Sequence, residues 1–328
     1  MNQNRPILYN WAMEVEEQRI TVDIIIPTYK RPRLLRNAIE SALIQTYPYI
    51  QQIIVTDDAC DLETRKIVEA FMLGDQRVFY VCNTKYLHGP AGNKNNGMDY
   101  VKSDYFLILD DDDLLVPNAV EEFVRATQNG KYDFVLANCL DSNGNYTGKH
   151  YGRDQQVSYE DFLCGKFDGE YLWLNRSQAI AELKLDEKIY AGEHISIWKA
   201  LKNSKAFYLH LPLRHYNTEG QRVSGQEVKK ADYWFQIYLK TLDNFGEDFS
   251  KYCPRRLLYF SLLLFFYGRL TGQTQQIKGY PKEYFRKTNN IAFLLPYVEL
   301  VLPKPLLVYI WKNTRSYKAK RKQQYRAL

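Results

Sequence analysis

Short apolar runs alternate with longer amphipathic segments from Val22 to about Leu136, and this alternation restricts the possible folds of the chain most. Val22 to Pro27 is a β-branched run long enough for a buried strand, and Arg33 to Gln45 has apolar residues at helical spacing. The same order of a strand followed by a helix recurs at Gln52 to Thr56 and Leu62 to Leu73. It predicts stacked βα units on a mostly parallel sheet, which is an α/β fold.

Polar loops follow three of the predicted strands, at Thr28 to Arg31, Asp57 to Asp61 and Asp110 to Asp113. The last loop comes directly after Tyr105 to Leu109, which has the pattern of a buried strand. A further short strand is predicted at Val78 to Cys82. In open α/β sheets, ligands bind beyond the carboxyl ends of the strands. We therefore expect a binding site where these loops meet.

The chain has 328 residues, of which 45% are hydrophobic and 25% charged, the balance of an ordinary soluble globular protein. This length allows one large domain with an appendage. From Gly130 to about Gln221 the composition becomes aromatic and polar with many glycines, and predicted strands alternate with loops. After about Val228 the chain becomes strongly helical. We expect these parts: an extension at 1–21, an α/β domain at 22–225 with halves at 22–120 and 121–225, and a helical region at 226–328.

The cysteine content and the amino-terminal composition predict an intracellular, cytoplasmic protein. The cysteines are odd in number and include no pair at Cys-x-x-Cys spacing, which predicts reduced thiols and no zinc site. Three glutamates interrupt the first 21 residues, which argues against a signal peptide. The five cysteines are Cys60, Cys82, Cys139, Cys164 and Cys253.

Four consecutive aspartates, Asp110 to Asp113, form the strongest local feature. Adjacent carboxylates repel each other, so they stay ionised at neutral pH only if cations or hydrogen-bond donors compensate them. Alternate residues of an extended segment point the same way, which allows Asp110 and Asp112 to converge on Mg²⁺ or Mn²⁺. The alternative is a helix cap before Pro117, which explains Asp113 alone.

Two further loops have a functional and a structural interpretation. Asp57 and Asp58 follow a strand, where a carboxylate can accept a hydrogen bond from a base or ribose, or can form an Asx-turn before the helix at Leu62. His88 to Gly97 reads as a loop rich in Gly and Asn with one Lys. It can present N–H groups and a cation to phosphate, or be a plain surface turn.

Together these residues resemble the family 2 glycosyltransferases of GT-A fold, and the match covers about Val22 to Val120 in order. The order and spacing of four segments make the combination specific. The segments are VDIIIPTYKRPRLLRNAIESALIQTY at 22–47, QQIIVTDDAC at 51–60, GPAGNKNNGM at 89–98 and YFLILDDDDLLVP at 105–117.

The resemblance implies a site for a nucleotide sugar, usually a UDP-sugar. Asp58 would bind the uracil edge, Asp111 would lie near the ribose, and Lys94 would stand where the family often has Arg, which keeps the charge but loses the fork geometry. Asp110 and Asp112 match the ends of the family's DxD motif, with Asp112 as the direct ligand of a cation that neutralises the diphosphate. The pocket for the base and ribose would contain Pro27, Thr28, Tyr29 and Arg31.

The resemblance also extends to the acceptor half. Glu193-His194 resembles the family's Glu-Asp motif, with His in place of the second acid, so Glu193 is the expected base for the acceptor hydroxyl and His194 the alternative. A purely structural Glu193, favoured by a helix amino terminus, is the competing interpretation. In the segment 213–225, His215 would complete the metal shell and Arg222 would contact diphosphate.

The carboxyl-terminal region combines two apolar segments with a basic tail. The segments 257–268 and 291–311 are too short or too interrupted to span a bilayer, and we expect both to lie in the headgroup region of an anionic membrane. Residues 312–328 contain seven Lys or Arg and no acid, which leaves about −1 of the formal charge of +6 for the rest of the chain. Packing of the apolar segments on the domain or on a second subunit is the alternative.

The sequence therefore predicts a metal-dependent inverting glycosyltransferase, peripheral on the inner face of the cell membrane. It would move a sugar from a nucleotide-diphosphate donor to a hydroxyl of a glycan acceptor on a lipid carrier, in bacterial surface polysaccharide synthesis. The rival is a nucleotide-sugar or glycan binding protein without catalysis, which the His194 departure favours. No nucleic-acid partner is expected, because base-reading and stacking motifs are missing.

Overall fold

One mixed sheet lies at the centre of the computed structural model, which describes residues 19–189, 192–217, 231–311 and 313. The strands are β1 (Val22–Thr28), β2 (Ile50–Asp57), β3 (Val78–Cys82), β4 (Tyr105–Ile108), β5 (Leu114–Leu115), β6 (Phe134–Leu140), β7 (Gln155–Val157), β8 (Tyr171–Arg176) and β9 (Ala206–His215). Their order is β3-β2-β1-β4-β8-β6-β9-β5, with β7 paired to β9. The pairs from β3 to β4 are parallel, whereas β8 is antiparallel to both β4 and β6.

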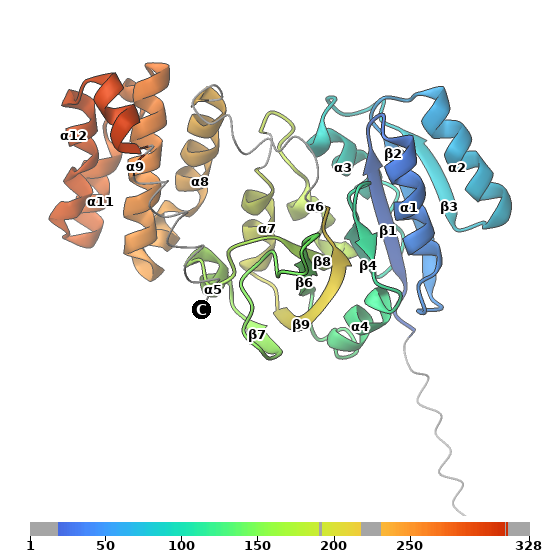
Figure 1. The fold of residues 1–328 in the computed structure, drawn as a ribbon. Helices are drawn as coiled ribbons and strands as arrows, with labels where there is room; N and C mark the ends of the chain where they lie inside the picture. The colour runs from blue at the N-terminus through green and yellow to red at the C-terminus, as the bar shows by residue number, and fades with distance from the viewer. Residues whose placement is uncertain (1–18, 190–191, 218–230, 312, 314–328) are drawn as a thin grey trace, which may run out of the picture.

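Helices cover the sheet and continue into a helical carboxyl-terminal part (Figure 1). Around the sheet lie α1 (Pro32–Leu43), α2 (Leu62–Gly74), α3 (Pro90–Met98), α4 (Ala119–Ala126), α5 (Tyr159–Leu163), η1 (Ser177–Ala179), α6 (Ile180–Leu183) and α7 (Glu193–Leu201). The carboxyl-terminal part contains α8 (Ala231–Tyr252), α9 (Pro254–Thr271), α10 (Thr274–Ile277), α11 (Tyr280–Thr288), η2 (Ile291–Leu294) and α12 (Pro296–Val301). The α/β fold with a helical extension is as predicted.

The central strand β1 is buried on both faces, as its continuous apolar run predicts. Ile24 and Ile26 belong to the core under α1, whereas Ile25 belongs to the core on the other face. The register places Thr28 beside Asp57 of β2 and Ile25 beside Ile108 of β4. The segments after β1, β2 and β4 therefore meet at one edge of the sheet.

The segment 88–97, expected to be a loop, is largely the helix α3. Glycine and asparagine are poor helix formers, so the prediction from local propensity was wrong because tertiary contacts hold this helix. The Asn93 side-chain amide donates to the carbonyls of Thr28 (3.0 Å) and Thr56 (2.9 Å). A Cβ on Gly97 would lie 2.5 Å from Ile25, so the helix approaches the sheet as closely as only glycine allows.

The segment 257–268 is not an interfacial helix, which corrects the expectation from its composition. It forms most of α9, whose residues Leu263 to Tyr267 are all buried. This helix packs against α8, and α8 in turn contacts α5 and α7, so α9 is a core element of the helical part. No described helix has the length and apolarity needed to cross a bilayer.

Four of the five cysteines form disulfides, Cys60–Cys82 and Cys164–Cys253, so the prediction of five reduced thiols was wrong. Only the buried Cys139 is free. Sequence spacing gave no signal, because the partners are 22 and 89 residues apart and are brought together by the fold. Parallel pairing sets Cys82 opposite Asp57, three residues from Cys60.

Candidate active site

The polar edge of the sheet opens into a cleft of about 1010 Å³. One wall comes from the segments after β1, β2 and β4 and from α3, and the other comes from β8, α7 and β9. The cleft is lined by all the predicted nucleotide-sugar residues that the structure describes. These are Pro27, Thr28, Tyr29, Arg31, Asp58, Lys94, Asp110 and Asp111, and the predicted metal ligand Asp112 lines the cleft as well.

The aspartate cluster is bound to the end of β1 by short polar contacts. The hydroxyl of Thr28 donates to Asp111 at 2.6 Å, and the Arg31 guanidinium contacts Asp111 at 3.1 Å and Asp112 at 2.9 Å. Burial raises the pKa of Asp111 to about 6, although Thr28 and Arg31 favour its ionised form. Asp111 is thus held by the protein itself, whereas Asp112 is more exposed to the cleft.

Lys94 joins the two walls of the cleft. Its ammonium lies 3.2 Å from Asp110 and 2.8 Å from Glu193, so one cation connects the predicted metal ligand with the predicted base. Burial by itself would lower the pKa of Lys94, but the two carboxylates outweigh it and hold the pKa above its usual range. Burial would likewise raise the pKa of Asp110, which Lys94 and Arg214 hold below its usual range.

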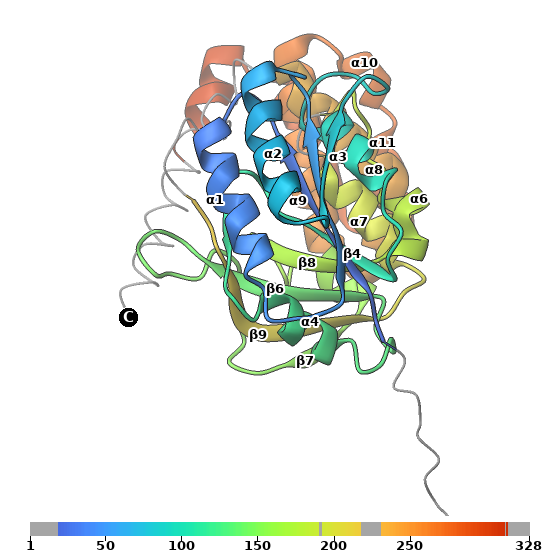
Figure 2. The same cartoon turned by 90° about the vertical axis from the view of Figure 1, so that its right-hand side faces the viewer.

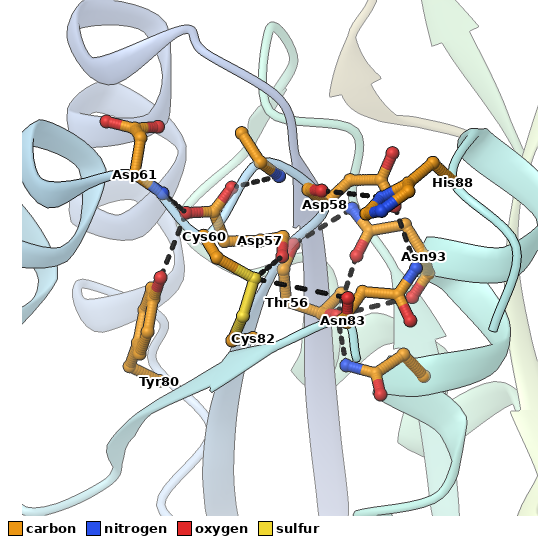
Figure 3. Close-up of a disulfide and its surroundings, with 12 residues drawn as sticks. Thr56, Asp57, Asp58, Cys60, Asp61, Tyr80, Cys82, Asn83, His88 and Asn93 are labelled. Atoms are coloured by element: carbon orange, nitrogen blue, oxygen red, sulfur yellow. Dashed lines mark hydrogen bonds and ion pairs between the residues drawn. A yellow bond between two sulfur atoms is a disulfide. The ribbon is translucent and has the colours of Figure 1, made fainter. Parts of the chain in front are cut away.

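Asp57 and Asp58 have different roles, although they are adjacent (Figure 3). Asp57 accepts hydrogen bonds from the backbone N–H groups of Ala59 (2.9 Å) and Asp61 (3.1 Å) and from the hydroxyl of Tyr80 (2.9 Å), so it forms the turn before α2. Asp58 instead lies in the cleft.

The carboxylate of Asp58 is oriented by two donors. The Asn83 amide donates to it at 2.7 Å and the backbone N–H of Gly89 at 2.8 Å, and its side chain is 6% exposed. Asn83 directly follows Cys82, so the Cys60–Cys82 disulfide joins the segment that carries Asp58 to the segment that orients it (Figure 3).

Below the aspartates lies a buried ion pair that the sequence did not reveal. The Arg214 guanidinium, 3% exposed, contacts Asp113 (1% exposed) at 3.2 Å and Glu170 at 2.9 Å. Burial raises the pKa of Asp113 to about 7, against the effect of Arg214, and the backbone N–H of Asn217 donates to Asp113 at 2.8 Å. Asp113 is therefore a structural anchor between the aspartate loop and β9. No local pattern could link positions 113, 170 and 214.

The other predicted residues do not all reach the cleft. Tyr29 lines the cleft at its rim, where it is 55% exposed. His215 is exposed at the end of β9, where it pairs with Leu114, and it is not among the residues that line the cleft. Arg222 lies outside the described residues.

Glu193 and His194 begin α7 but face different surroundings. Glu193 lines the cleft, whereas the imidazole Nε2 of His194 lies 3.0 Å from the hydroxyl of Thr241 on α8, and its ring packs edge-on against Trp198. Burial lowers the pKa of His194 to about 4, so its imidazole is neutral at pH 7. His194 therefore contributes to the contact between α7 and α8.

His194 should make the fold less stable in acid. Its pKa falls from 6.5 unfolded to about 4 folded, so the unfolded state takes up a proton first and the stabilisation present above pH 6.5 is lost as the pH falls toward 4. Between pH 7 and pH 4.5, the free energy of unfolding of His194→Gln in urea should fall by about 2 kcal/mol less than that of the wild type. If the free energy of unfolding fell equally with pH in both proteins, groups other than His194 would be responsible for the acid sensitivity.

The carboxylates after β4 have the right chemistry for Mg²⁺ or Mn²⁺. Asp110 and Asp112 offer oxygen ligands, and they form direct ion pairs with Lys94 and Arg31 respectively. No three His, Cys, Asp or Glu side chains of the described residues are grouped as in a metal site made by protein alone. Divalent cations in nucleotide sites need only one or two carboxylates when phosphates complete the shell, so this donor set fits a cation that is bound together with a diphosphate.

Comparison with known proteins agrees with this geometry. Residues 23–190 match the family described as Glycosyl transferase family 2. The chain is 34% identical over 227 residues, 68% of its length and 72% of the relative's, to the GalNAc(5)-diNAcBac-PP-undecaprenol beta-1,3-glucosyltransferase of Campylobacter jejuni. It is 27% identical over 44% of its length, and 56% of the relative's, to the Escherichia coli UDP-Glc:alpha-D-GlcNAc-diphosphoundecaprenol beta-1,3-glucosyltransferase WfgD.

The fold is similar to that of a solved structure. Residues 1–349 of Staphylococcus aureus TarS, in complex with UDP-GlcNAc, superpose with a TM-score of 0.59 at 16% sequence identity, over 93% of this chain and 92% of that one. That likeness establishes the GT-A type fold, and the family match establishes the class of enzyme. The chain therefore belongs to glycosyl transferase family 2 and is a glycosyltransferase of the hexosyl-transferring kind.

Proposed function

We propose that this protein transfers a hexose from a UDP-sugar to a hydroxyl of a lipid-linked glycan, with inversion at the anomeric carbon. The observation that carries the proposal is the double contact of Lys94 with Asp110 and Glu193. This contact supports the proposal, because one cation links an aspartate of the proposed diphosphate site to a carboxylate that can receive a proton.

The donor would occupy the half of the cleft formed after β1, β2 and β4. Asp58 would accept a hydrogen bond from the base, since its two protein donors leave lone pairs free. Arg31 and Lys94 would contact the diphosphate, because each forms an ion pair with an aspartate that lines the cleft. Asp112 and Asp110 would hold the divalent cation, which when bound neutralises charge on the leaving diphosphate.

The reaction would proceed by a single displacement. Glu193 would accept the proton of the acceptor hydroxyl as the hydroxyl oxygen forms a bond to the anomeric carbon. The bond from that carbon to the diphosphate oxygen breaks, and the diphosphate leaves with the electron pair. Lys94 would stabilise this negative charge, as a positioned cation does best in a site of restricted water access.

The acceptor half of the cleft suits a sugar. Trp173 offers aromatic surface, and Glu170 offers a carboxylate for hydroxyl groups. The names of the two glucosyltransferase relatives describe polyprenyl-diphosphate-linked acceptors, which supports an acceptor of that class.

A thermal-shift panel of nucleotide sugars, with and without Mn²⁺, tests the donor proposal. One UDP-hexose at about 100 times its Kd should raise the melting temperature by about 5 °C, and more with Mn²⁺ than without. The Asp112→Asn variant should lose the contribution of Mn²⁺. A panel in which no nucleotide sugar shifts the transition would contradict the proposal.

A further inference from the structure

Residues 291–311 expose an unusual share of the apolar side chains of the protein. Of the large hydrophobic residues that are exposed in the described part of the chain, seven of 21 lie in this segment of 21 residues. Elsewhere such residues occur mostly singly or in pairs, which is normal for a protein surface. The seven are Ile291, Leu295, Val298, Val301, Leu306, Tyr309 and Ile310.

These side chains lie on the outer sides of the last helices. Leu295, Val298 and Val301 are spaced by three residues, which sets them along one side of α12, while Pro296 is buried on the other. In the helical residues 304–311, Leu307 is 4% exposed and packs into the core, whereas Tyr309 is 66% exposed. We call the seven exposed side chains the apolar end face. α11 and α12 stand at the end of the molecule opposite α1 and α2 (Figures 1 and 2).

Positive charge is concentrated in the same carboxyl-terminal region as the apolar end face. Residues 226–328 contain 19 Lys or Arg and seven Asp or Glu, a net charge of +12, whereas residues 1–225 carry a net charge of −6. Between residues 284 and 328 the sole acid is Glu299. Burial raises the pKa of Glu299 to about 8, so its carboxyl is mostly neutral at pH 7 and adds no negative charge to the end face. The seven cations of residues 312–328 follow the apolar end face directly in the sequence.

We propose that the apolar end face and the basic residues that follow it dock this enzyme on an anionic lipid bilayer. Leu, Ile and Val side chains beside Tyr309 match the boundary between headgroups and acyl chains, and clustered Lys and Arg match anionic headgroups. A second copy that met this one through the same face would bring like charges together and be repelled, which disfavours a dimer joined there. If the proposed function is correct, the same membrane would carry both the docked enzyme and its lipid-linked acceptor.

Flotation of the full chain with vesicles tests the proposal. The protein should float with vesicles that contain phosphatidylglycerol and stay unbound with pure phosphatidylcholine, and rising salt should weaken the binding. The triple variant Leu295→Glu, Val298→Glu, Val301→Glu should lower the vesicle partition coefficient roughly tenfold or more, because it removes apolar area and adds repelling charge. Truncation after residue 311 should remove the preference for phosphatidylglycerol.

The matched control is the double variant Ile44→Glu, Leu73→Glu, which alters side chains 62% and 92% exposed in the other half of the protein. Its partition coefficient should equal that of the wild type. UDP binding by all variants reports that the cleft is intact, so loss of flotation is separable from failure of the proposed function. Equal flotation of the triple variant and the wild type would overturn the proposal. So would a wild-type dimer in sedimentation that the triple variant converts to monomer without a change in flotation, because the end face would then join two copies.

Discussion

Replacement of Glu193 by Gln is expected to lower kcat by about 10³-fold and to leave the affinity for the nucleotide sugar nearly unchanged. Glutamine keeps the size of the side chain and an oxygen that can accept from Lys94, so the 2.8 Å contact across the cleft can persist as a weaker hydrogen bond. It cannot take up the proton of the acceptor hydroxyl. The loss should therefore appear in the chemical step and not in binding.

The measurement is steady-state kinetics with donor and acceptor, together with calorimetric titration of UDP. Glu69→Gln is the matched control, because Glu69 is exposed on α2, away from the cleft, and pairs with Arg65 of its own helix in an i,i+4 pair. That variant should keep wild-type kcat. If Glu193→Gln kept more than about a tenth of wild-type kcat, Glu193 would not be the base. A large rise in KM for the donor without loss of kcat would assign it to binding.

Replacement of Arg214 by Met is expected to destabilise the protein by about 3–5 kcal/mol. Removal of the guanidinium leaves Asp113, 1% exposed, as a buried carboxylate without its cation, and removes the partner of Glu170.

A double-mutant cycle in urea unfolding separates this pair from general packing damage. Asp113→Asn keeps the oxygen that accepts from Asn217 and removes the charge, so the double variant should recover about 2 kcal/mol. Arg65→Met, which breaks the exposed pair with Glu69, should cost at most about 0.5 kcal/mol. A coupling energy near zero in the Arg214–Asp113 cycle would show that the two side chains do not depend on each other.

The parallel half of the sheet could be predicted because its elements are specified locally. The β-branched runs and the helical spacing gave β1, β2, β3 and β4 to within a few residues, and the aspartates fell at the carboxyl end of β4 as expected. The same local rules failed for α3. Its Asn and Gly residues favour loops, and the hydrogen bonds from Asn93 to β1 and β2 override that preference.

Features that depend on distant partners could not be predicted. Arg214 meets Asp113 only because β9 returns to pair with β5, and Cys60 meets Cys82 only because β2 and β3 lie side by side. The environment of His194 has the same origin, since Thr241 comes from α8. From the sequence, Glu193 and His194 were both candidates for the base. In the fold, Glu193 lines the cleft, whereas His194 lies in the contact between α7 and α8.

Analysis of the transfer product tests the central claim most directly. The purified enzyme would be incubated with a panel of UDP-hexoses, Mn²⁺ and a polyprenyl-diphosphate-linked glycan, and the product examined by mass spectrometry and by NMR of the new anomeric centre. We predict release of UDP, a glycan longer by one hexose, and a new linkage of anomeric configuration opposite to that of the donor, with none of these from Asp112→Asn. A product that retains the donor configuration, or transfer undiminished by Asp112→Asn, would contradict the account.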